Sequence, residues 1–288
     1  PAAPPNYSMG GVVGGVAGFI APSKAFLVSG LIPFSPSSRS FLASSGSRTT
    51  CGVRKTRSSV LTFSFEVDLN KLPSSGRSPS TGSFRTVELS TSRDEVGAAF
   101  TLSINGHPVF VKGVNWIPDD HFLTRITAER IARRLDQAVA ANVNLIRVWG
   151  GGIFESEDFY RACDERGLLV WQDFLLACAA YPEESPLWEE IEAEARENVV
   201  RLMSHPSLVL YNGGNENLWG HADWHWQERL DGRTWGAKYA YNLFPAIVAE
   251  LDPTRPYSDN SPYSPRVDSQ DVHPNDPDHG THHQWEVW

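Results

Sequence analysis

The sequence predicts an α/β fold, in particular a (β/α)8 TIM barrel that is incomplete, with about six strands, and that follows a poorly structured N-terminal segment. From about residue 105, short apolar runs alternate with amphipathic segments, which is typical of a parallel sheet covered by helices. Polar and aromatic residues also gather where each predicted strand ends, as on the active-site face of a barrel, whereas an open doubly wound sheet gathers them at one switch point. These strand-end pairs are Asn115 and Trp116, Arg147 and Trp149, Gln172 and Asp173, and Asn215 and Glu216.

Residues 1–82 differ in composition from the rest of the chain. They hold eight basic and two acidic residues, while the remainder holds 17 basic and 32 acidic residues. Stretches such as "SPSSRSFLASSGSRTT" cannot bury enough apolar area to offset the entropy of the chain. We therefore expect a low-complexity segment that is disordered or outside the family of the main body; a transit-like segment and a foreign N-terminus fit equally well.

Charge and cysteine content exclude several classes of function. The net charge is −9, and the acidic main body has no basic stripe to neutralise phosphates, so we expect no nucleic-acid partner. The run Gly10–Ala21 is too short and Gly-rich to span a membrane, and it lacks the basic start of a signal peptide. Three cysteines without a close pair indicate neither a disulfide framework nor a zinc ribbon. We expect a cytoplasmic protein without cofactor or membrane partner.

The first elements after residue 82 are short strands. Residues 83–104 are interpreted as the end of a β-sandwich or a linker, and residues 105–288 as the partial barrel. "NG" at 105–106 predicts a hairpin. A helix follows over 128–141, with Thr127 as its N-cap. Its apolar face is predicted to hold Ile131, Leu135, Ala138 and Val139.

The later elements continue the alternation of strands and helices. Ser185 is predicted to cap a helix whose first residue is Pro186. A helical stretch near 235–251 is predicted to restart at Pro245. The remaining predicted elements are strands at 144–150, 168–174, 207–213, 255–262 and 282–288 and a helix at 156–167.

Two carboxylates at strand ends are candidates for chemistry. Glu216 lies between amides with Trp219 nearby, so an apolar wall could keep it protonated as a donor to a leaving oxygen; the alternative is a solvated loop glutamate. Asp173 either binds a substrate hydroxyl or forms a structural ion pair with Arg147.

Aromatic residues indicate a sugar ligand. Flat indoles suit the faces of a pyranose, and Trp116, Trp149, Trp219, Trp285 and Trp288 lie near the candidate carboxylates or in the last strand. Trp171 and Trp188 instead fit core packing. The segment "HPNDPDHGTHH" is turn-rich and matches no zinc spacing, so no metal is expected from His273, His279, His282, His283, Asp276 and Asp278.

Together these residues resemble the β-mannosidase branch of glycoside hydrolase family 2. The resemblance runs from about Phe84 to Trp288 and implies a retaining exo-glycosidase that removes terminal β-linked mannose from oligosaccharides or glycans. The motifs that carry it are "GVNWIPDD" (113–120), "NLIRVWGGGIFESEDFYRACDERGLLVWQDFLLACAAYP" (144–182), "HPSLVLYNGGNENLWG" (205–220), "LDPTRPYSDNSPY" (251–263) and "HHQWEVW" (282–288).

The resemblance also implies roles for particular residues. Glu216 matches the acid/base, and Asn215 matches the amide that contacts the 2-hydroxyl of the sugar. Other substrate-binding positions are matched by Arg147, Trp149, Asp173, Trp219, His283, Trp285, Trp116 and Asp120.

The sequence departs from the family pattern at two places. Gly214 stands where the family usually has a second Asn. The family nucleophile, a glutamate at the end of the seventh strand, has no counterpart, and Glu286 is inside the sixth-strand motif. We therefore expect a fragment with the acid/base and little activity of its own. The alternatives are a non-catalytic carbohydrate-binding fragment and a family 2 glycosidase of the β-galactosidase or β-glucuronidase type.

Overall fold

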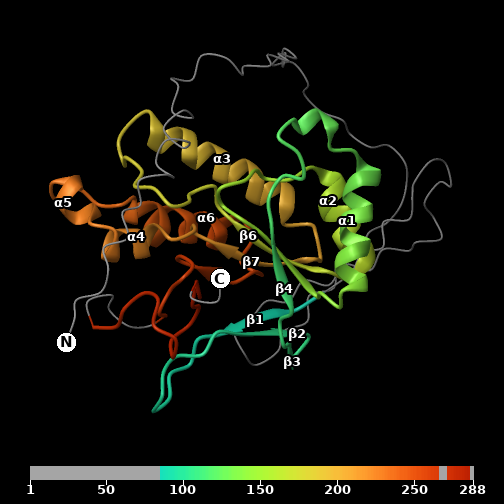
Figure 1. The fold of residues 1–288 in the computed structure, drawn as a ribbon, viewed down its shortest axis with the longest axis horizontal. Helices are drawn as coiled ribbons and strands as arrows, with labels where there is room; N and C mark the ends of the chain where they lie inside the picture. The colour runs from blue at the N-terminus through green and yellow to red at the C-terminus, as the bar shows by residue number, and fades with distance from the viewer. Residues whose placement is uncertain (1–84, 266–270, 286–288) are drawn as a thin grey trace, which may run out of the picture. The chain divides into compact units, whose positions relative to one another are not determined.

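The computed structural model describes residues 85–265 and 271–285 (Figure 1). The predicted disorder of residues 1–82 lies outside this range, as do Trp288 and Glu286. Within it, no helix is both long and apolar enough to cross a membrane.

A small antiparallel sheet precedes the main body. It consists of β1 (Val87–Ser90), β2 (Thr101–Ile104) and β3 (His107–Pro108), in that order. Asn105 and Gly106 have φ angles of 52° and 76° and join β2 to β3, so the predicted hairpin is confirmed. The predicted domain boundary after residue 104 falls within this hairpin.

The main sheet has five parallel strands that follow one another in chain order. They are β4 (Gly113–Trp116), β5 (Leu145–Val148), β6 (Leu169–Asp173), β7 (Leu208–Asn212) and β8 (Tyr257–Ser258). Since the order never reverses, the described sheet has no switch point of the doubly wound kind. The α/β class is therefore confirmed. The expected sixth strand is wrong over 282–285, which form no strand, while 286–288 lie outside the described residues.

The first helices follow the strands, as Figure 1 shows. They are α1 (Ala128–Ala140), α2 (Glu157–Arg166) and α3 (Leu187–Leu202). Thr127 caps α1, because its side chain accepts a hydrogen bond from the Arg130 N–H. Of the residues predicted on the apolar face, Ile131 and Leu135 are buried, whereas Val139, in the last turn, is 46% exposed.

The predicted start of α3 is also wrong by one residue. Pro186, not Ser185, occupies the N-cap position, because the Pro186 carbonyl accepts the helical bond from the Glu190 N–H, and no side chain caps the helix.

The C-terminal part contains shorter helices. The 3₁₀ turn η2 (Leu123–Arg125) follows β4, and α4 (Asn217–Asp223) and α5 (Trp226–Leu230) follow β7. A π-helical stretch, η3 (Tyr239–Leu243), leads into α6 (Phe244–Leu251), with Pro245 in its first turn. This confirms the predicted helical stretch near 235–251.

The two faces of the parallel sheet have different coverings. Ile146, Val148 and Val170 face the helices and pack in the main core with residues such as Leu135 and Phe159. On the other face, Leu145 and Leu169, at the starts of their strands, pack against Leu102 of the small sheet. That face is therefore filled at the amino ends of the strands and left free for a site at the carboxyl ends.

Trp171 and Trp188 are partly buried and pack against the core, as predicted. Trp171 stacks on Phe100 with ring centroids 5.6 Å apart, and Trp188 stacks on Tyr239 at 5.0 Å.

Candidate active site

An open pocket of about 590 Å³ lies at the carboxyl ends of the strands. The structure brings together six of the predicted site residues in its lining: Arg147, Trp149, Asn215, Glu216, His283 and Trp285. Asn115, Ile117, Cys178, His282 and Gln284 complete the lining. Among these described lining residues, Glu216 is the one carboxylate.

The turn after β7 aims Glu216 into the pocket. Its φ of 59° lies in the left-handed region, which is strained for a residue with a side chain. Two backbone bonds hold this conformation: the Glu216 N–H donates to the Ser261 carbonyl at 2.8 Å, and the Glu216 carbonyl accepts from the Gly220 N–H at 2.8 Å. The turn therefore starts α4 and fixes the direction of the carboxylate at the same time.

A glycine at position 214 makes this turn possible. Gly214 has a φ of 155°, and a Cβ there would lie 2.5 Å from Asn217 Oδ1 and 2.8 Å from the Leu176 carbonyl oxygen. The family that the sequence resembles usually has an Asn at this position. An Asn side chain here would need a different backbone path.

Glu216 is 7% exposed, and the two oxygens of its carboxylate have different neighbours. Oε1 lies 2.7 Å from His283 Nδ1, and Oε2 accepts a bond from the Cys178 thiol at 3.4 Å. Burial acts to raise the pKa of Glu216, but hydrogen bonds from His283, Cys178 and Trp285 outweigh it, so the pKa is lowered. The expected apolar wall that keeps the acid protonated is therefore wrong for this structure, because polar side chains surround the carboxylate.

Cys178 connects Glu216 and Asn215, because its thiol hydrogen-bonds to both side chains. Its thiol also accepts a bond from the Asn215 amide at 3.3 Å. Burial and the neighbouring Glu216 carboxylate raise the pKa of Cys178 to about 12, so it stays a neutral thiol.

A buried ion pair lies behind the pocket. Arg147 Nη2 donates to Asp173 Oδ2 at 2.8 Å and to Asn215 Oδ1 at 2.9 Å. Asp173 is fully buried and also accepts bonds from the Gly150 N–H, the Trp171 indole and the Asn212 amide. Of the two interpretations of Asp173, the structure shows the ion pair with Arg147, and through Arg147 it orients the Asn215 amide.

Besides Asp173, three predicted site residues do not line the pocket. Trp116 points toward the helices, where its indole donates to Glu155 at 2.9 Å, because side chains alternate along β4 and Asn115 takes the pocket side. Asp120 accepts a bond from Arg130 at 2.9 Å. Trp219 donates to Asp223 at 2.7 Å and meets the His283 ring edge-on at 6.2 Å.

Some residues of the site were not predicted from the sequence, and only one of them could have been. The alternation of β4 could have placed Asn115 in the pocket. Nothing local marks Cys178 or Ser261, because only the packing of three loops brings them to Glu216.

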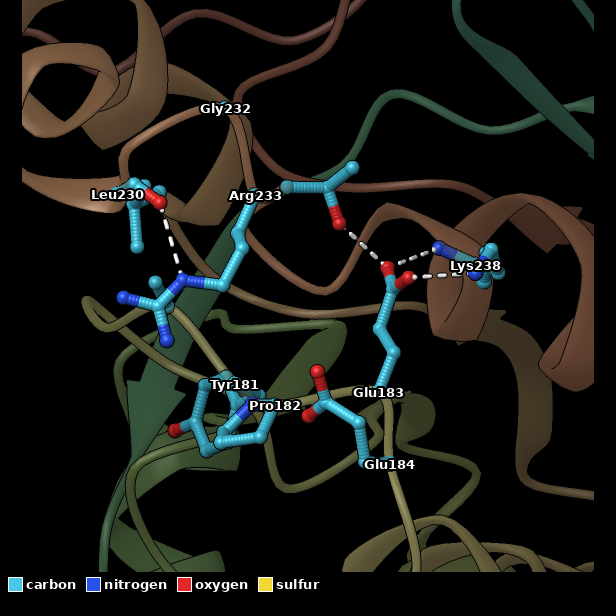
Figure 2. A pocket seen from close by; sticks show the side chains of 10 residues that line it. Tyr181, Pro182, Glu183, Glu184, Leu230, Gly232, Arg233 and Lys238 are labelled. Atoms are coloured by element: carbon cyan, nitrogen blue, oxygen red, sulfur yellow. Dashed lines mark hydrogen bonds and ion pairs between the residues drawn. The ribbon is translucent and has the colours of Figure 1, made fainter.

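A second pocket of about 380 Å³ is lined by residues from 180–184 and 230–238. Figure 2 shows Glu183 turned toward Lys238, with its carboxylate 3.1 Å from Lys238 Nζ. Thr234 also donates to Glu183, at 2.6 Å. This pocket contains none of the predicted site residues.

The described part of the chain contains no group of three or more His, Cys, Asp or Glu side chains placed to hold a metal. Several of the C-terminal histidines instead bind single carboxylates: His273 lies 2.9 Å from Asp223, and His279 lies 2.8 Å from Asp276.

The known proteins that resemble this chain include several β-mannosidases. No family model matches the chain. It is 41% identical over 215 residues to β-mannosidase B of Aspergillus flavus, covering 71% of this chain and 25% of that protein. It is 40% identical over 191 residues to β-mannosidase of Capra hircus, covering 62% and 21%. The crystal structure of β-D-mannosidase from Dictyoglomus thermophilum matches with 46% identity and a TM-score of 0.66, covering 71% and 24%.

The relatives that this chain matches are glycosidases, a class whose active sites often lie at the carboxyl ends of parallel strands. Within this class, the chain is a homologue of the β-mannosidases over about 70% of its length, which confirms the resemblance in the sequence. It spans about a quarter of the length of the curated relatives that it matches.

Proposed function

We propose that this chain carries the acid/base half of the active site of a retaining exo-β-mannosidase. The substrate is a terminal, non-reducing β-D-mannose residue of an oligosaccharide or glycan. One observation supports this most: Glu216 and Asn215 lie together in the pocket, on a chain that is homologous to β-mannosidases. We further propose that the five parallel strands belong to an eight-stranded barrel, which their uninterrupted chain order supports.

In this mechanism, Glu216 acts first as an acid. It donates a proton to the glycosidic oxygen while a second carboxylate attacks the anomeric carbon and forms a covalent glycosyl-enzyme. Glu216 then acts as a base, taking a proton from the water that releases mannose. The low pKa of Glu216 suits the second step. A nearby second carboxylate would raise this pKa by charge repulsion and so favour the first step.

The other pocket residues bind the sugar. The Asn215 amide, held by Arg147, contacts the 2-hydroxyl. The indoles of Trp149 and Trp285 pack against the pyranose faces. Asp173 supports Arg147 from behind, and Trp219 supports His283. Trp116 and Asp120 are further from the pocket and act on its shape rather than on the sugar.

The proposed nucleophile is a second carboxylate, which the described residues of the pocket do not supply. In retaining glycosidases, the two carboxyl groups are roughly 5–5.5 Å apart, and no other carboxylate is found among the described residues of the pocket lining. The chain alone therefore has little or no activity.

Two assays test the proposal. The chain alone should hydrolyse 4-nitrophenyl β-D-mannoside only at the background rate, and turnover at ordinary enzyme rates would overturn the claim that it lacks the nucleophile. The chain extended by its own downstream coding sequence should hydrolyse the same substrate, but not the β-galactoside or β-glucuronide. Hydrolysis of the latter two instead would assign it to another family 2 activity.

The role of Glu216 is tested in the extended protein. Glu216→Ala should slow aryl mannosides with poor leaving groups far more than those with good leaving groups, because only poor leaving groups need the proton. Glu165→Ala, on the exposed surface of α2, is the matched control. Equal losses on both kinds of substrate would contradict the acid role. Sugar binding without turnover in the extended protein would favour a binding module.

A further inference from the structure

A chain of hydrogen-bonding groups connects Ser261, His283 and Glu216. Ser261 Oγ lies 2.9 Å from His283 Nε2, and His283 Nδ1 lies 2.7 Å from Glu216 Oε1. A carboxylate can only accept, so Nδ1 must carry a hydrogen. In the neutral ring, Nε2 then accepts from the Ser261 hydroxyl, which fixes the tautomer of the imidazole.

The three groups are also fixed by backbone contacts. The Ser261 carbonyl accepts from the Glu216 N–H at 2.8 Å, so Ser261 holds the backbone of the acid and the ring of its partner. Asn275 holds His283 from both sides: its Oδ1 accepts from the His283 N–H at 2.7 Å, and its Nδ2 donates to the His283 carbonyl at 3.0 Å. Ser261 is 2% exposed, so the far end of this chain of groups is buried, while Glu216 and His283 line the pocket.

We propose that His283 is the positioning residue of Glu216, binding Oε1 so that Oε2 is the oxygen that carries and exchanges the proton. Glu216 sets the tautomer of His283, the Ser261 hydroxyl satisfies the opposite ring nitrogen, and Asn275 holds the backbone of His283. The inference depends on the proposed function only for the acid/base role of Glu216.

The charges around Glu216 agree with this division between its two oxygens. The titratable side chains in contact with it are His283, from the C-terminal segment, and Cys178, from the loop after β6. Arg147 of β5 lines the same pocket, but its charge is balanced by Asp173. The bond from His283 is the largest effect that lowers the pKa of Glu216, so its removal should raise this pKa.

The experiment is a carboxyl titration by ¹³C NMR of the full chain labelled at the side-chain carboxyl carbon of glutamate. The Glu216 signal is assigned by its loss in Glu216→Gln. His283→Phe keeps a ring but no donor and should raise the Glu216 pKa. His283→Asn keeps an amide donor near the position of Nδ1 and should return the pKa toward that of the unchanged chain. His121→Phe, at an exposed position outside the pocket, is the matched control and should leave it unchanged.

An unchanged Glu216 titration in His283→Phe would overturn the proposal, as would a failure of His283→Asn to differ from His283→Phe. If His283→Phe unfolds, Ser261→Ala carries the test, because it removes one buried oxygen and should shift the Glu216 pKa in the same direction. An unchanged titration in that variant would then overturn the proposal. The titration needs no turnover, so its failure is distinguishable from failure of the proposed function.

Discussion

Arg147 Nη2 lies 2.8 Å from Asp173 Oδ2, and the two side chains are 11% and 0% exposed. β5 and β6 are adjacent parallel strands, so this contact joins the carboxyl ends of both strands beneath the pocket. Asp173 is therefore a support of the site.

Asp173→Ala should strongly destabilise the chain, because it leaves the Arg147 charge buried and removes the acceptor of several other donors. We expect a loss of about 3–5 kcal/mol in the free energy of unfolding. Urea denaturation measures it. The matched control is Asp158→Ala, which removes the exposed partner of Arg161 and should cost no more than about 1 kcal/mol. Equal losses would contradict the buried ion pair.

Two substitutions on α1 should differ in their effect on stability. Leu135 is fully buried in the main core, whereas Val139 is 46% exposed. Leu135→Ala should cost about 2–5 kcal/mol because it leaves a cavity. Val139→Ala should stay within about 0.5 kcal/mol. Thermal unfolding of both variants checks this, and a large loss for Val139→Ala would contradict its exposed position.

At the C-terminus of α2, replacing Gly167 should reduce stability through the backbone conformation alone. Gly167 has a φ of 68°, and a Cβ there would meet nothing within 4 Å. Gly167→Ala should therefore cost about 1–2 kcal/mol through the left-handed backbone alone. At Gly150, a Cβ would lie 2.7 Å from the Phe174 carbonyl oxygen and 2.8 Å from that of Leu176, so Gly150→Ala should cost more. Chemical denaturation that ranks the two variants in the opposite order would contradict this.

Asp164 predicts a loss of stability in acid. Burial acts to raise its pKa, but hydrogen bonds from His205 and Ser207 lower it below the ordinary value of 3.8. A lowered pKa in the folded state means that the stabilisation is complete above 3.8 and is lost as the pH falls through the folded pKa.

Unfolding by urea between pH 5 and pH 2 measures this dependence. Asp164→Asn should flatten it, whereas Glu165→Gln, at the exposed neighbour, should leave it as steep as in the unchanged chain. The same slope in Asp164→Asn would exclude Asp164 as a cause.

Local patterns were sufficient for most of the elements. Apolar periodicity predicted α1 and α3, and apolar runs predicted the strands β5 to β7, because backbone geometry sets the spacing of side chains along each element. The predictions were less reliable at the ends of helices. The first residue of α3 and the exposure of Val139, in the last turn of α1, depend on packing against neighbouring elements. Residues 282–285 (HHQW) pair with no strand in the described part, although the motif to which they belong predicted one.

The sequence by itself determined that Asn215 and Glu216 follow a buried strand and that indoles lie at the ends of neighbouring strands. Only the tertiary structure decided which of these side chains share the pocket. The register of the sheet turned Asn115 inward and Trp116 outward, and it set Asp173 behind the pocket against Arg147. His283 reaches Glu216 across 67 residues of chain, and Ser261 and Cys178 arrive on other loops. The protonation behaviour of the carboxylate depends on these distant partners, because charge and hydrogen bonding act through space and not along the sequence.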